Sequence, residues 1–311
     1  MAQHFLSILD YTTDELARTL ALATALKTAR RQRVVSPHAS VMAGRHVGLL
    51  FEKPSLRTRV TFTIGIGELG GSVVDIPSDV MHADREPLHD VARNLERWVD
   101  AVVIRTFAQG RLGIFTESAP GLHIVNALSD EEHPCQALAD MQTLQERWGS
   151  VAGRTIAFVG DGNNVATSLV HAGLMLGAHM RVATPKGYGL PAEVAEAAGR
   201  IAVKGAELKQ YIDPTDAVKG ADAIYTDVWT SMGQEVEYAE RTKTFSRYQV
   251  NETMMARAKS DALFMHCLPA HRGQEVSDDV MESSASVAFD QAENRLHAQK
   301  AMLVALFADT R

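Results

Sequence analysis

Short apolar runs alternate with amphipathic segments along the whole chain, and this alternation is the best guide to the fold. The apolar runs have the length of strands, and the segments between them place apolar residues at helical spacing. Strands that alternate with helices along a chain form mainly parallel sheets. The pattern therefore predicts an α/β fold.

The first half of the chain contains one series of expected strands and helices. The strands are His46–Phe51, Ser72–Ile76, Ala101–Arg105 and His123–Asn126. The helices are Arg57–Leu69, Pro87–Val99 and Cys135–Trp148. A helix is also expected before the first strand, with Thr13 as its N-cap and its end near Lys27, because Thr is a favoured capping residue.

A second series follows the glycine-containing stretch Trp148–Gly153, which we interpret as a junction. Its expected strands are Thr155–Val159, Met180–Ala183, Glu207–Tyr211, Ala223–Thr226 and Leu263–His266. Its expected helices are Val165–Leu176, Pro191–Ala202, Asn251–Lys259 and the long final helix Asp290–Ala308.

This order predicts two α/β domains of similar size, each with a mainly parallel sheet flanked by helices. Residues 1–148 form the first domain, which the C-terminal helix (about 290–311) joins, and residues 149–289 form the second. A chain of 311 residues is long enough for two domains of ordinary size. Ligands tend to bind between such domains, so we expect the active site in a cleft between them.

Composition and charge narrow the classes of partner. Hydrophobic residues make up 46% of the chain and charged residues 22%, which is a globular balance. The net charge of −7 argues against nucleic acid or an anionic membrane as a partner. No stretch approaches the ~20 apolar residues of a membrane span, and residues 1–10 lack the basic segment of a signal peptide. We therefore expect a soluble protein.

The cysteines indicate the compartment and bear on metal binding. Cys135 and Cys267 lie far apart and form no CxxC pair, which fits a reducing cytoplasm and argues against a disulfide framework. His266 and His271 flank Cys267 but lack the spacing of metal ligands. We expect a cytoplasmic protein without a metal, and a buried, inert thiol is the alternative interpretation of Cys267.

An anion site is indicated where the first strand meets the next helix. The helix is expected to begin just after Pro54, with Ser55 near its N-cap. The unpaired N–H groups and the dipole of a helix N-terminus favour an anion. Hydroxyls of Ser55 and Thr58 and the guanidinium of Arg57 add donors suited to phosphate. Taken alone, the same residues are equally typical of a capped helix with surface arginines.

Two further residues stand at strand or helix ends in the first half. Arg105 closes an apolar strand, where a buried guanidinium needs a polar or anionic partner. His133 follows a strand and opens a helix, although a lone histidine there is more often structural than catalytic.

The turn 159–166 in the second half loosely imitates a dinucleotide-binding fingerprint, through Gly160, Gly162 and Ala166. An NAD(P)-dependent dehydrogenase is therefore an alternative function. Such a site needs an acidic residue at the end of the next strand, and residues 180–185 contain none. Arg181 lies within that strand and not at its end, so we expect no nucleotide cofactor.

Five motifs, in order along nearly the whole chain, resemble those of the aspartate/ornithine carbamoyltransferase family. Ser55–Arg59 resembles the family's Ser-Thr-Arg-Thr-Arg, with Leu56 in place of the first Thr. The other motifs are His133–Gln136, Asp227–Gly233, His266–Pro269 and Asp290–Arg295. The Asp-x-x-x-Ser-Met-Gly and His-Cys-Leu-Pro motifs are those of the ornithine branch. By composition alone Asp227 would be a solvated acid at the start of a loop.

The resemblance implies a transferase that moves the carbamoyl group of carbamoyl phosphate to the δ-amine of L-ornithine in arginine biosynthesis, with no cofactor. The first domain would bind carbamoyl phosphate and the second ornithine. Residues expected at carbamoyl phosphate are Ser55, Leu56 through its main-chain N–H, Arg57, Thr58, Arg105, His133, Gln136, Cys267, Leu268 and Arg295. Those expected at ornithine are Asn164, Asp227, Ser231 and Met232. The catalytic set would be Arg105, His133, Cys267 and Asp227.

The family also implies a homotrimer with active sites at subunit interfaces. The loop Ser78–Glu86 would reach the neighbouring subunit's carbamoyl phosphate, and Met81 stands where many ornithine enzymes carry a Gln. Met donates no hydrogen bond, so we assign this contact to His82. Remaining alternatives are a carbamoyltransferase for putrescine, acetylornithine or aspartate, and a catalytically silent relative that binds anions or proteins.

Overall fold

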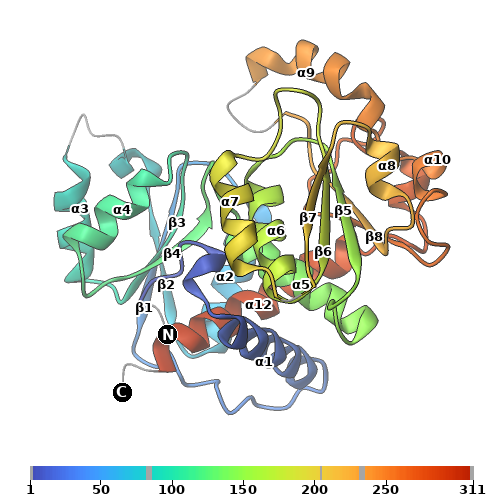
Figure 1. Cartoon of the computed structure of the whole chain (residues 1–311). Coiled ribbons are helices and arrows are strands. Elements are labelled where there is room, and N and C mark those ends of the chain that lie inside the picture. Colours follow the sequence, from blue (N-terminus) through green and yellow to red (C-terminus); the bar gives the residue numbers. More distant parts are fainter. Residues whose placement is uncertain (1–2, 82–85, 204, 231–234, 309–311) are drawn as a thin grey trace. The chain divides into compact units, whose positions relative to one another are not determined.

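The computed structural model describes residues 3–81, 86–203, 205–230 and 235–308, and confirms the expected α/β class (Figure 1). The chain divides into two compact units. Unit 1 is Met1–Gln142 with Asn294–Arg311, and unit 2 is Thr143–Glu293. Both boundaries fall inside helices, α5 (Pro134–Trp148) and α12 (Ala288–Ala308), so these two helices each contribute residues to both units.

Unit 1 is built on a four-stranded parallel sheet with the order β2-β1-β3-β4. The strands are β1 (His46–Phe51), β2 (Ser72–Ile76), β3 (Ala101–Arg105) and β4 (His123–Leu128). The central strands β1 and β3 are almost wholly buried, whereas β2 forms an exposed edge. A register shift between Ile104 and Arg105 pairs Arg105 with Leu128, two residues beyond the expected end of β4.

Helices cover both faces of this sheet (Figure 1). They are α1 (Thr13–Arg31), α2 (Leu56–Glu68), α3 (Leu88–Glu96), α4 (Gly110–Ser118) and parts of α5 and α12, with short 3-10 turns η1 (Ile8–Asp10) and η2 (Ser78–Met81). On one face, Val91 of α3 and Phe115 of α4 pack with Val102 and Ile104 of β3. Burial of these apolar groups is the main force that holds the layers together.

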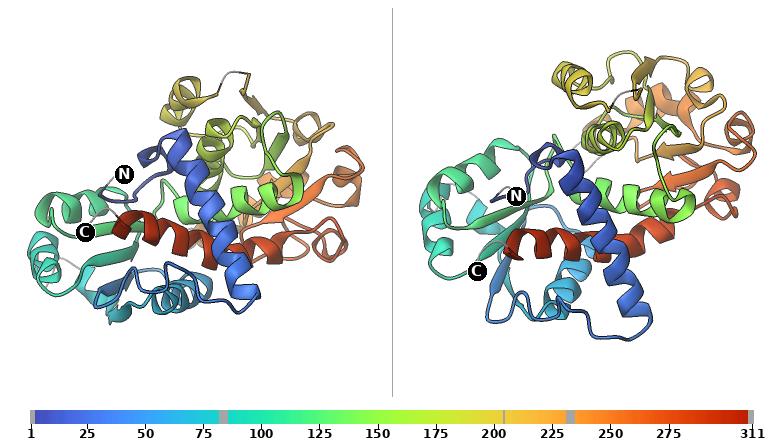
Figure 2. Two further views of the ribbon diagram at one scale, coloured as in Figure 1. Left: turned by 90° about the horizontal axis from the view of Figure 1, so that it is seen from below. Right: turned by 60° about the horizontal axis from the view of Figure 1, so that its bottom comes forward.

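Within unit 1, α1 crosses the C-terminal part of α12 (Figure 2). Ala23 and Leu26 of α1 pack on Ala301 of α12. Lys27, only 4% exposed, donates from Nζ to Oδ1 of Asn294 over 2.7 Å. The end of the chain is therefore built into the core of the unit that contains its beginning.

Unit 2 is built on a five-stranded parallel sheet with the order β7-β6-β5-β8-β9. The strands are β5 (Thr155–Val159), β6 (His179–Ala183), β7 (Leu208–Tyr211), β8 (Ala223–Thr226) and β9 (Leu263–His266). The helices are α6 (Asn164–Met175), α7 (Ala192–Ile201), α8 (Pro214–Val218), α9 (Tyr238–Phe245), α10 (Glu252–Met255) and α11 (Asp278–Met281), with 3-10 turns η3 (Glu235–Glu237) and η4 (Ser246–Tyr248).

Several expected boundaries were wrong, and a capping group explains one of them. The N-cap of α1 is Thr12 and not Thr13, because Thr12 and Glu15 bond each other's backbone N–H groups in a capping box. Asn251 caps α10 through Met254 N, but the helix ends at Met255 and not at Lys259. The expected helix Pro87–Val99 is likewise shorter, because α3 ends at Glu96.

Helices α4, α8, α9 and α11 were not predicted from the sequence. Gly110 and Gly113 lower the helix propensity of α4, and α8 and α11 are too short to show a helical repeat. Across the described residues, no helix combines the length and apolar character needed to cross a bilayer.

Candidate active site

The carboxyl ends of the unit 1 strands bring three loops to one sheet edge. Glu52 N, just after β1, donates to Arg105 O at the end of β3 over 2.8 Å. Thr106 N donates to Leu128 O at the end of β4 over 2.9 Å. Parallel pairing thus places the start of α2, the end of β3 and the loop before α5 along one line, which is where ligands of open α/β sheets bind.

The N-terminus of α2 has the expected cap. Ser55 is the N-cap, with extended backbone, and its Oγ accepts from Thr58 N over 3.3 Å and donates to Thr58 Oγ1 over 2.9 Å. The side chain of Leu56 is 76% exposed and points to solvent. Leu56 stands where the family motif has Thr, and this difference leaves the backbone of the first helical turn available to a ligand. First-turn N–H groups have no acceptor within their own helix.

Arg295 joins three distant parts of the chain within unit 1. It is 2% exposed and comes from α12. Its Nη1 donates to Gln136 Oε1 of α5 over 2.8 Å, and its Nη2 donates to Thr58 Oγ1 of α2 over 3.1 Å. Gln136 is oriented in turn by a bond from its Nε2 to Asp140 Oδ1 over 2.8 Å. The structure therefore brings together three of the residues expected at carbamoyl phosphate, namely Arg295, Gln136 and Thr58.

His133 lies buried among the arginines of unit 1. Burial lowers the pKa of His133 well below its ordinary 6.5, and the charges of Arg295, Arg105 and Arg57 lower it further. The imidazole is therefore neutral near pH 7, with one N–H to donate and one nitrogen to accept. Arg105 itself is 9% exposed at the end of β3.

Charged residues that the sequence analysis passed over stabilise these loops. Lys53 is 5% exposed, donates from Nζ to Asp130 Oδ1 over 2.6 Å and lies 4.1 Å from the centre of the Phe107 ring. Glu52 accepts from Thr106 and Arg111. Two charged residues directly after a buried strand were the available signal, but their partners lie too far along the chain for spacing to reveal them.

In unit 2, Asp227 follows β8 and lies 7% exposed among three donors. Its Oδ1 accepts from Cys267 Sγ over 3.0 Å and from Val228 N over 2.8 Å. Its Oδ2 accepts from Asn163 Nδ2 over 2.8 Å. Asp227 is therefore held in place, and the interpretation of this residue as a solvated acid is wrong.

Asn163, which the sequence analysis did not select, connects Asp227 to α6. It is the N-cap of that helix, and its Oδ1 accepts from Val165 N and Ala166 N over 3.0 and 3.1 Å. Its amide nitrogen remains for Asp227. The expected ligand Asn164 is the first residue of α6. Capping preference could not have distinguished the two adjacent asparagines, because either one suits an N-cap and only the observed helix start separates them.

The end of β9 has an unusual backbone that His266 supports. Leu268 has a φ of 59°, in the left-handed region that side chains disfavour. Its N–H donates to His266 Nδ1 over 2.9 Å. The other ring nitrogen, Nε2, lies 3.2 Å from Glu275 Oε1, and both side chains are fully buried. His266 thus holds the main chain that follows Cys267.

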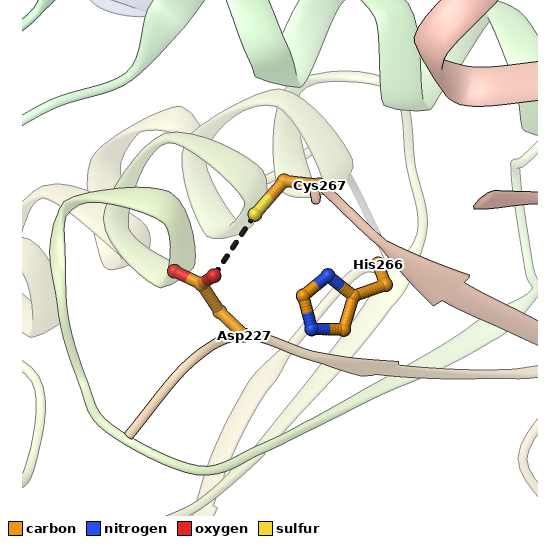
Figure 3. A group of neighbouring side chains, drawn as sticks. All are labelled: Asp227, His266 and Cys267. Atoms are coloured by element: carbon orange, nitrogen blue, oxygen red, sulfur yellow. Dashed lines mark hydrogen bonds between the residues drawn. The ribbon is translucent and has the colours of Figure 1, made fainter. Parts of the chain in front are cut away.

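Asp227, His266 and Cys267 form the one group of the described residues that has the proximity of a metal site, with potential ligand atoms within 4.8 Å of one another (Figure 3). The hydrogen bonds argue against that use. The lone pair of His266 Nδ1 accepts from Leu268 N–H, so Nε2 carries the proton and faces Glu275. The Cys267 thiol donates to Asp227. Each ligand atom is already engaged within the protein.

Two glycines shape the turn between β5 and α6. Gly160 has a φ of 145°, which other residues rarely adopt. A Cβ on Gly162 would lie 2.5 Å from backbone atoms of Gly189 and Leu190. The conformation of the chain therefore explains Gly160, and close backbone packing explains Gly162, whatever their likeness to a nucleotide-binding fingerprint. The predicted ligands Ser231, Met232 and His82 lie outside the described residues.

Comparison with protein families gives two matches that together cover most of the chain. Residues 3–146 match the aspartate/ornithine carbamoyltransferase, carbamoyl-P binding domain. Residues 152–306 match the Asp/Orn binding domain of the same family.

Individual proteins and structures agree with these matches. The chain is 48% identical over 311 residues to an ornithine carbamoyltransferase of Parafrankia sp. (strain EAN1pec), covering 99% of this chain and 97% of that protein. It is 47% identical over 303 residues to one of Parasynechococcus marenigrum (strain WH8102), covering 97% and 93%. The structure of ornithine carbamoyltransferase from Pyrococcus furiosus superposes with a TM-score of 0.94 at 44% identity, covering 99% of this chain and 98% of that one.

Proposed function

The chain belongs to the aspartate/ornithine carbamoyltransferase family, and we propose that this transferase moves the carbamoyl group of carbamoyl phosphate to the δ-amine of L-ornithine, giving L-citrulline and phosphate. Its relatives of 47% and 48% identity are ornithine carbamoyltransferases along nearly their whole length. The rival assignments as a dehydrogenase or a silent anion-binding relative have no comparable support.

The observation that carries the choice of acceptor is the Cys267–Asp227 contact. Asp227 is a buried carboxylate at the end of β8, and the thiol of Cys267 holds one of its oxygens. A fixed carboxylate attracts an acceptor with two ammonium groups, as ornithine has. It repels aspartate more, because aspartate carries two carboxylates and only one ammonium group. Putrescine also has amines, but it lacks the α-amino-acid group that Asp227, Asn164 and the Ser231–Met232 segment would recognise.

Carbamoyl phosphate is assigned to the cationic residues of unit 1. It carries about two negative charges near neutral pH, by analogy with phosphate esters. Arg57, Arg105 and Arg295 supply balancing charge, while Ser55, Thr58 and the main-chain N–H of Leu56 supply donors at the α2 N-terminus. Gln136, held by Arg295 and Asp140, would contact the carbamoyl group.

The reaction needs a neutral amine. The δ-amine of ornithine resembles that of lysine, with a pKa of about 10 in water, so it must lose a proton before it attacks. Exclusion of water and the nearby arginines would lower that pKa. The amine nitrogen then bonds to the carbamoyl carbon, and the carbonyl electron pair moves onto oxygen. Asp227 and Cys267 would orient the amine during this step.

The tetrahedral intermediate places negative charge on the carbonyl oxygen. Neutral His133, Arg105 and Thr58 are the donors proposed to stabilise it, as in an oxyanion hole. The carbonyl reforms as the carbon–oxygen bond to phosphate breaks, and a phosphate oxygen takes the amine proton. The main-chain carbonyls of Cys267 and Leu268 would accept from the carbamoyl NH₂, and His266 fixes that main chain.

We also propose that the chain assembles as a homotrimer with active sites shared between subunits. An apolar surface stripe on α2 of unit 1 supports self-association, formed by Leu56, Val60 and Ile64 at four-residue spacing, with exposures of 76%, 44% and 38%. A contiguous apolar stripe on an exposed helix face is typical of a surface that another chain covers. The contribution of His82 to a neighbouring site remains a prediction.

A cytoplasmic location is part of the same proposal. Both cysteines, Cys135 and Cys267, are free and buried. Free thiols persist in a reducing compartment.

One assay tests the choice of acceptor. The purified protein is given carbamoyl phosphate with ornithine, putrescine, acetylornithine or aspartate, and the carbamoylated products are measured. We expect citrulline from ornithine, with kcat/KM for the other acceptors lower by at least about a hundred-fold, because each leaves polar groups of the site unpaired. Faster turnover of any other acceptor would contradict the assignment.

A further inference from the structure

Arg241 lies in unit 2 outside every motif considered above, yet it is among the most completely buried charges of that unit. It comes from α9, is 3% exposed, and lies against two aromatic rings that also contact each other. Its guanidinium carbon is 4.9 Å from the centre of the Tyr188 ring and 5.3 Å from that of Phe245. A buried guanidinium packed against two rings has little freedom to turn, so the direction of its donors is fixed.

The donors of Arg241 join two segments that lead to the acceptor site. Its Nε donates to the main-chain oxygen of Trp229 over 2.5 Å. Its Nη2 donates to Asp161 Oδ2, and its Nη1 donates to Glu237 Oε2 over 3.3 Å. Trp229 lies two residues after Asp227 and two residues before Ser231 in the sequence.

Asp161 connects Arg241 to Asp227 from the other side. It lies in the β5–α6 turn, where its main-chain oxygen accepts from Asn163 N over 2.7 Å. Asn163 in turn donates to Asp227 Oδ2. Burial raises the pKa of Asp161 to about 6, while the charge of Arg241 opposes that rise. Burial disfavours the charged form of Asp161, and the positive charge of Arg241 stabilises that form. The loss of either residue should therefore affect the other.

We infer that Arg241 is a positioning residue for the acceptor substrate, because it ties the β5–α6 turn to the backbone of Trp229 and thereby sets the location of Asp227. This inference rests on the proposed function. Arg241 touches no reacting atom in this arrangement and acts through Asp161 and Trp229. The alternative is that the pair only contributes to the stability of unit 2.

The main test variant is Arg241→Lys, which keeps the charge but cannot bond both Trp229 O and Asp161 from a planar fork. We expect KM for ornithine to rise by at least about ten-fold while KM for carbamoyl phosphate stays within roughly two-fold of the parent. The matched control is Arg247→Met in η4, whose side chain is 76% exposed and lies 3.9 Å from Asp213. The control should match the parent for both substrates.

A double variant keeps the inference testable if the single change destabilises the fold. Loss of Arg241 alone leaves a buried carboxylate unpaired, whereas Asp161→Asn with Arg241→Met removes both charges together. The double variant should retain the parent's Tm within a few degrees and still show the raised KM for ornithine, because the bond to Trp229 is gone.

The outcomes separate the two claims. A parent enzyme that makes no citrulline would reject the proposed function. An active parent whose double variant keeps the parent's KM for ornithine would reject the role of Arg241. An equal rise in both KM values, or a loss of Tm with unchanged kinetics in folded protein, would assign the pair to stability alone.

Discussion

At the scale of single residues, charge distinguishes the two groups of candidate site residues. In unit 1, Arg57, Arg105 and Arg295 lower the pKa of His133. In unit 2, the candidate site contains the carboxylates of Asp227, held by Cys267 and Asn163, and Asp161, held by Arg241. Carbamoyl phosphate, which is dianionic, would meet positive charge in unit 1, and ornithine, which has two amines, would meet negative charge in unit 2. The net charge of the whole chain, −7, does not reveal this separation.

The neutral state of buried His133 should be visible in the pH dependence of stability. Because its pKa in the folded state is depressed, the unfolded chain takes up a proton below about pH 6.5 that the folded chain does not. Its contribution to stability is therefore present above that pH and lost as the pH falls. Removal of the imidazole should flatten the slope by up to ~1.4 kcal/mol per pH unit.

Urea denaturation of the parent and of His133→Gln, at several pH values from about 5 to 7.5, measures this slope. His133→Asn serves as the control, since it also lacks a titrating group but has a different volume. Both variants should give the same shallower slope even if their stabilities differ. A slope equal to that of the parent would show that His133 titrates alike in the two states.

Single residues also show where sequence reasoning succeeds. Ser55 was predicted as a cap because the signal is local: a hydroxyl just before a helix. Asn163, Glu275 and Arg241 were not selected, because their partners lie from 9 to 80 residues away in the chain. Such partnerships depend on which strands become neighbours, and no local pattern contains that information.

At the scale of elements, the strands were predicted well because apolar, β-branched runs such as Ala101–Arg105 are fully buried. Helices on the protein surface were predicted less well. The sequence of α9 is mostly polar, and its place depends on Arg241, which packs against Tyr188 of another segment and donates to Asp161 and Trp229. Tertiary contacts stabilise that helix more than its own propensity does.

The β5–α6 turn allows an element-scale prediction, because Gly162 packs against another backbone segment. Gly162→Ala should destabilise the protein by about 1–3 kcal/mol, because the added Cβ would meet backbone atoms of Gly189 and Leu190, which cannot move aside as a flexible side chain can. The control is Gly199→Ala in α7, where an added Cβ meets nothing within 4 Å. That change should stabilise by roughly 0.5–1 kcal/mol through helix propensity.

Urea unfolding of both variants distinguishes these effects, and the kinetics of Gly162→Ala add a second readout. Because the turn leads to Asn163 and Asp227, KM for ornithine should rise as well. If both substitutions changed the free energy of unfolding in the same direction, backbone packing would not explain why residue 162 is a glycine.

At the scale of the whole molecule, the two-domain organisation followed from the order of strands and helices. Two separate segments of the sequence form unit 1. The sequence predicted this only in outline, as a C-terminal helix that joins the first domain. The contacts that hold α12 there, Lys27 with Asn294 and Ala301 with α1, join the two ends of the sequence. Their register depends on packing, which hydrophobic periodicity does not specify.

Self-association through the apolar stripe on α2 yields a prediction for the assembly. The double change Val60→Lys with Ile64→Lys should disrupt the trimer, because each copy would place two charges in an apolar interface. Both positions lie on the helix surface, so the subunit should stay folded. The control is Ile114→Lys on α4, whose exposure of 37% is close to the 38% of Ile64.

Analytical ultracentrifugation measures the mass of each species, and circular dichroism reports whether it is folded. We expect a trimer for the parent and for the control, and a smaller folded species for the double variant. A double variant that sediments like the parent would place the interface elsewhere.

The placement of α12 has a consequence for how the protein is made. A ribosome synthesises residues 1–142 before unit 2, but Asn294, Arg295 and Ala301, which complete the core and the anion site of unit 1, are made only after unit 2. Unit 2 is continuous in sequence and can fold while synthesis proceeds. Unit 1 cannot complete its core until residues 294–301 have been made. The part of the molecule that begins to be translated first is therefore completed after the part that follows it.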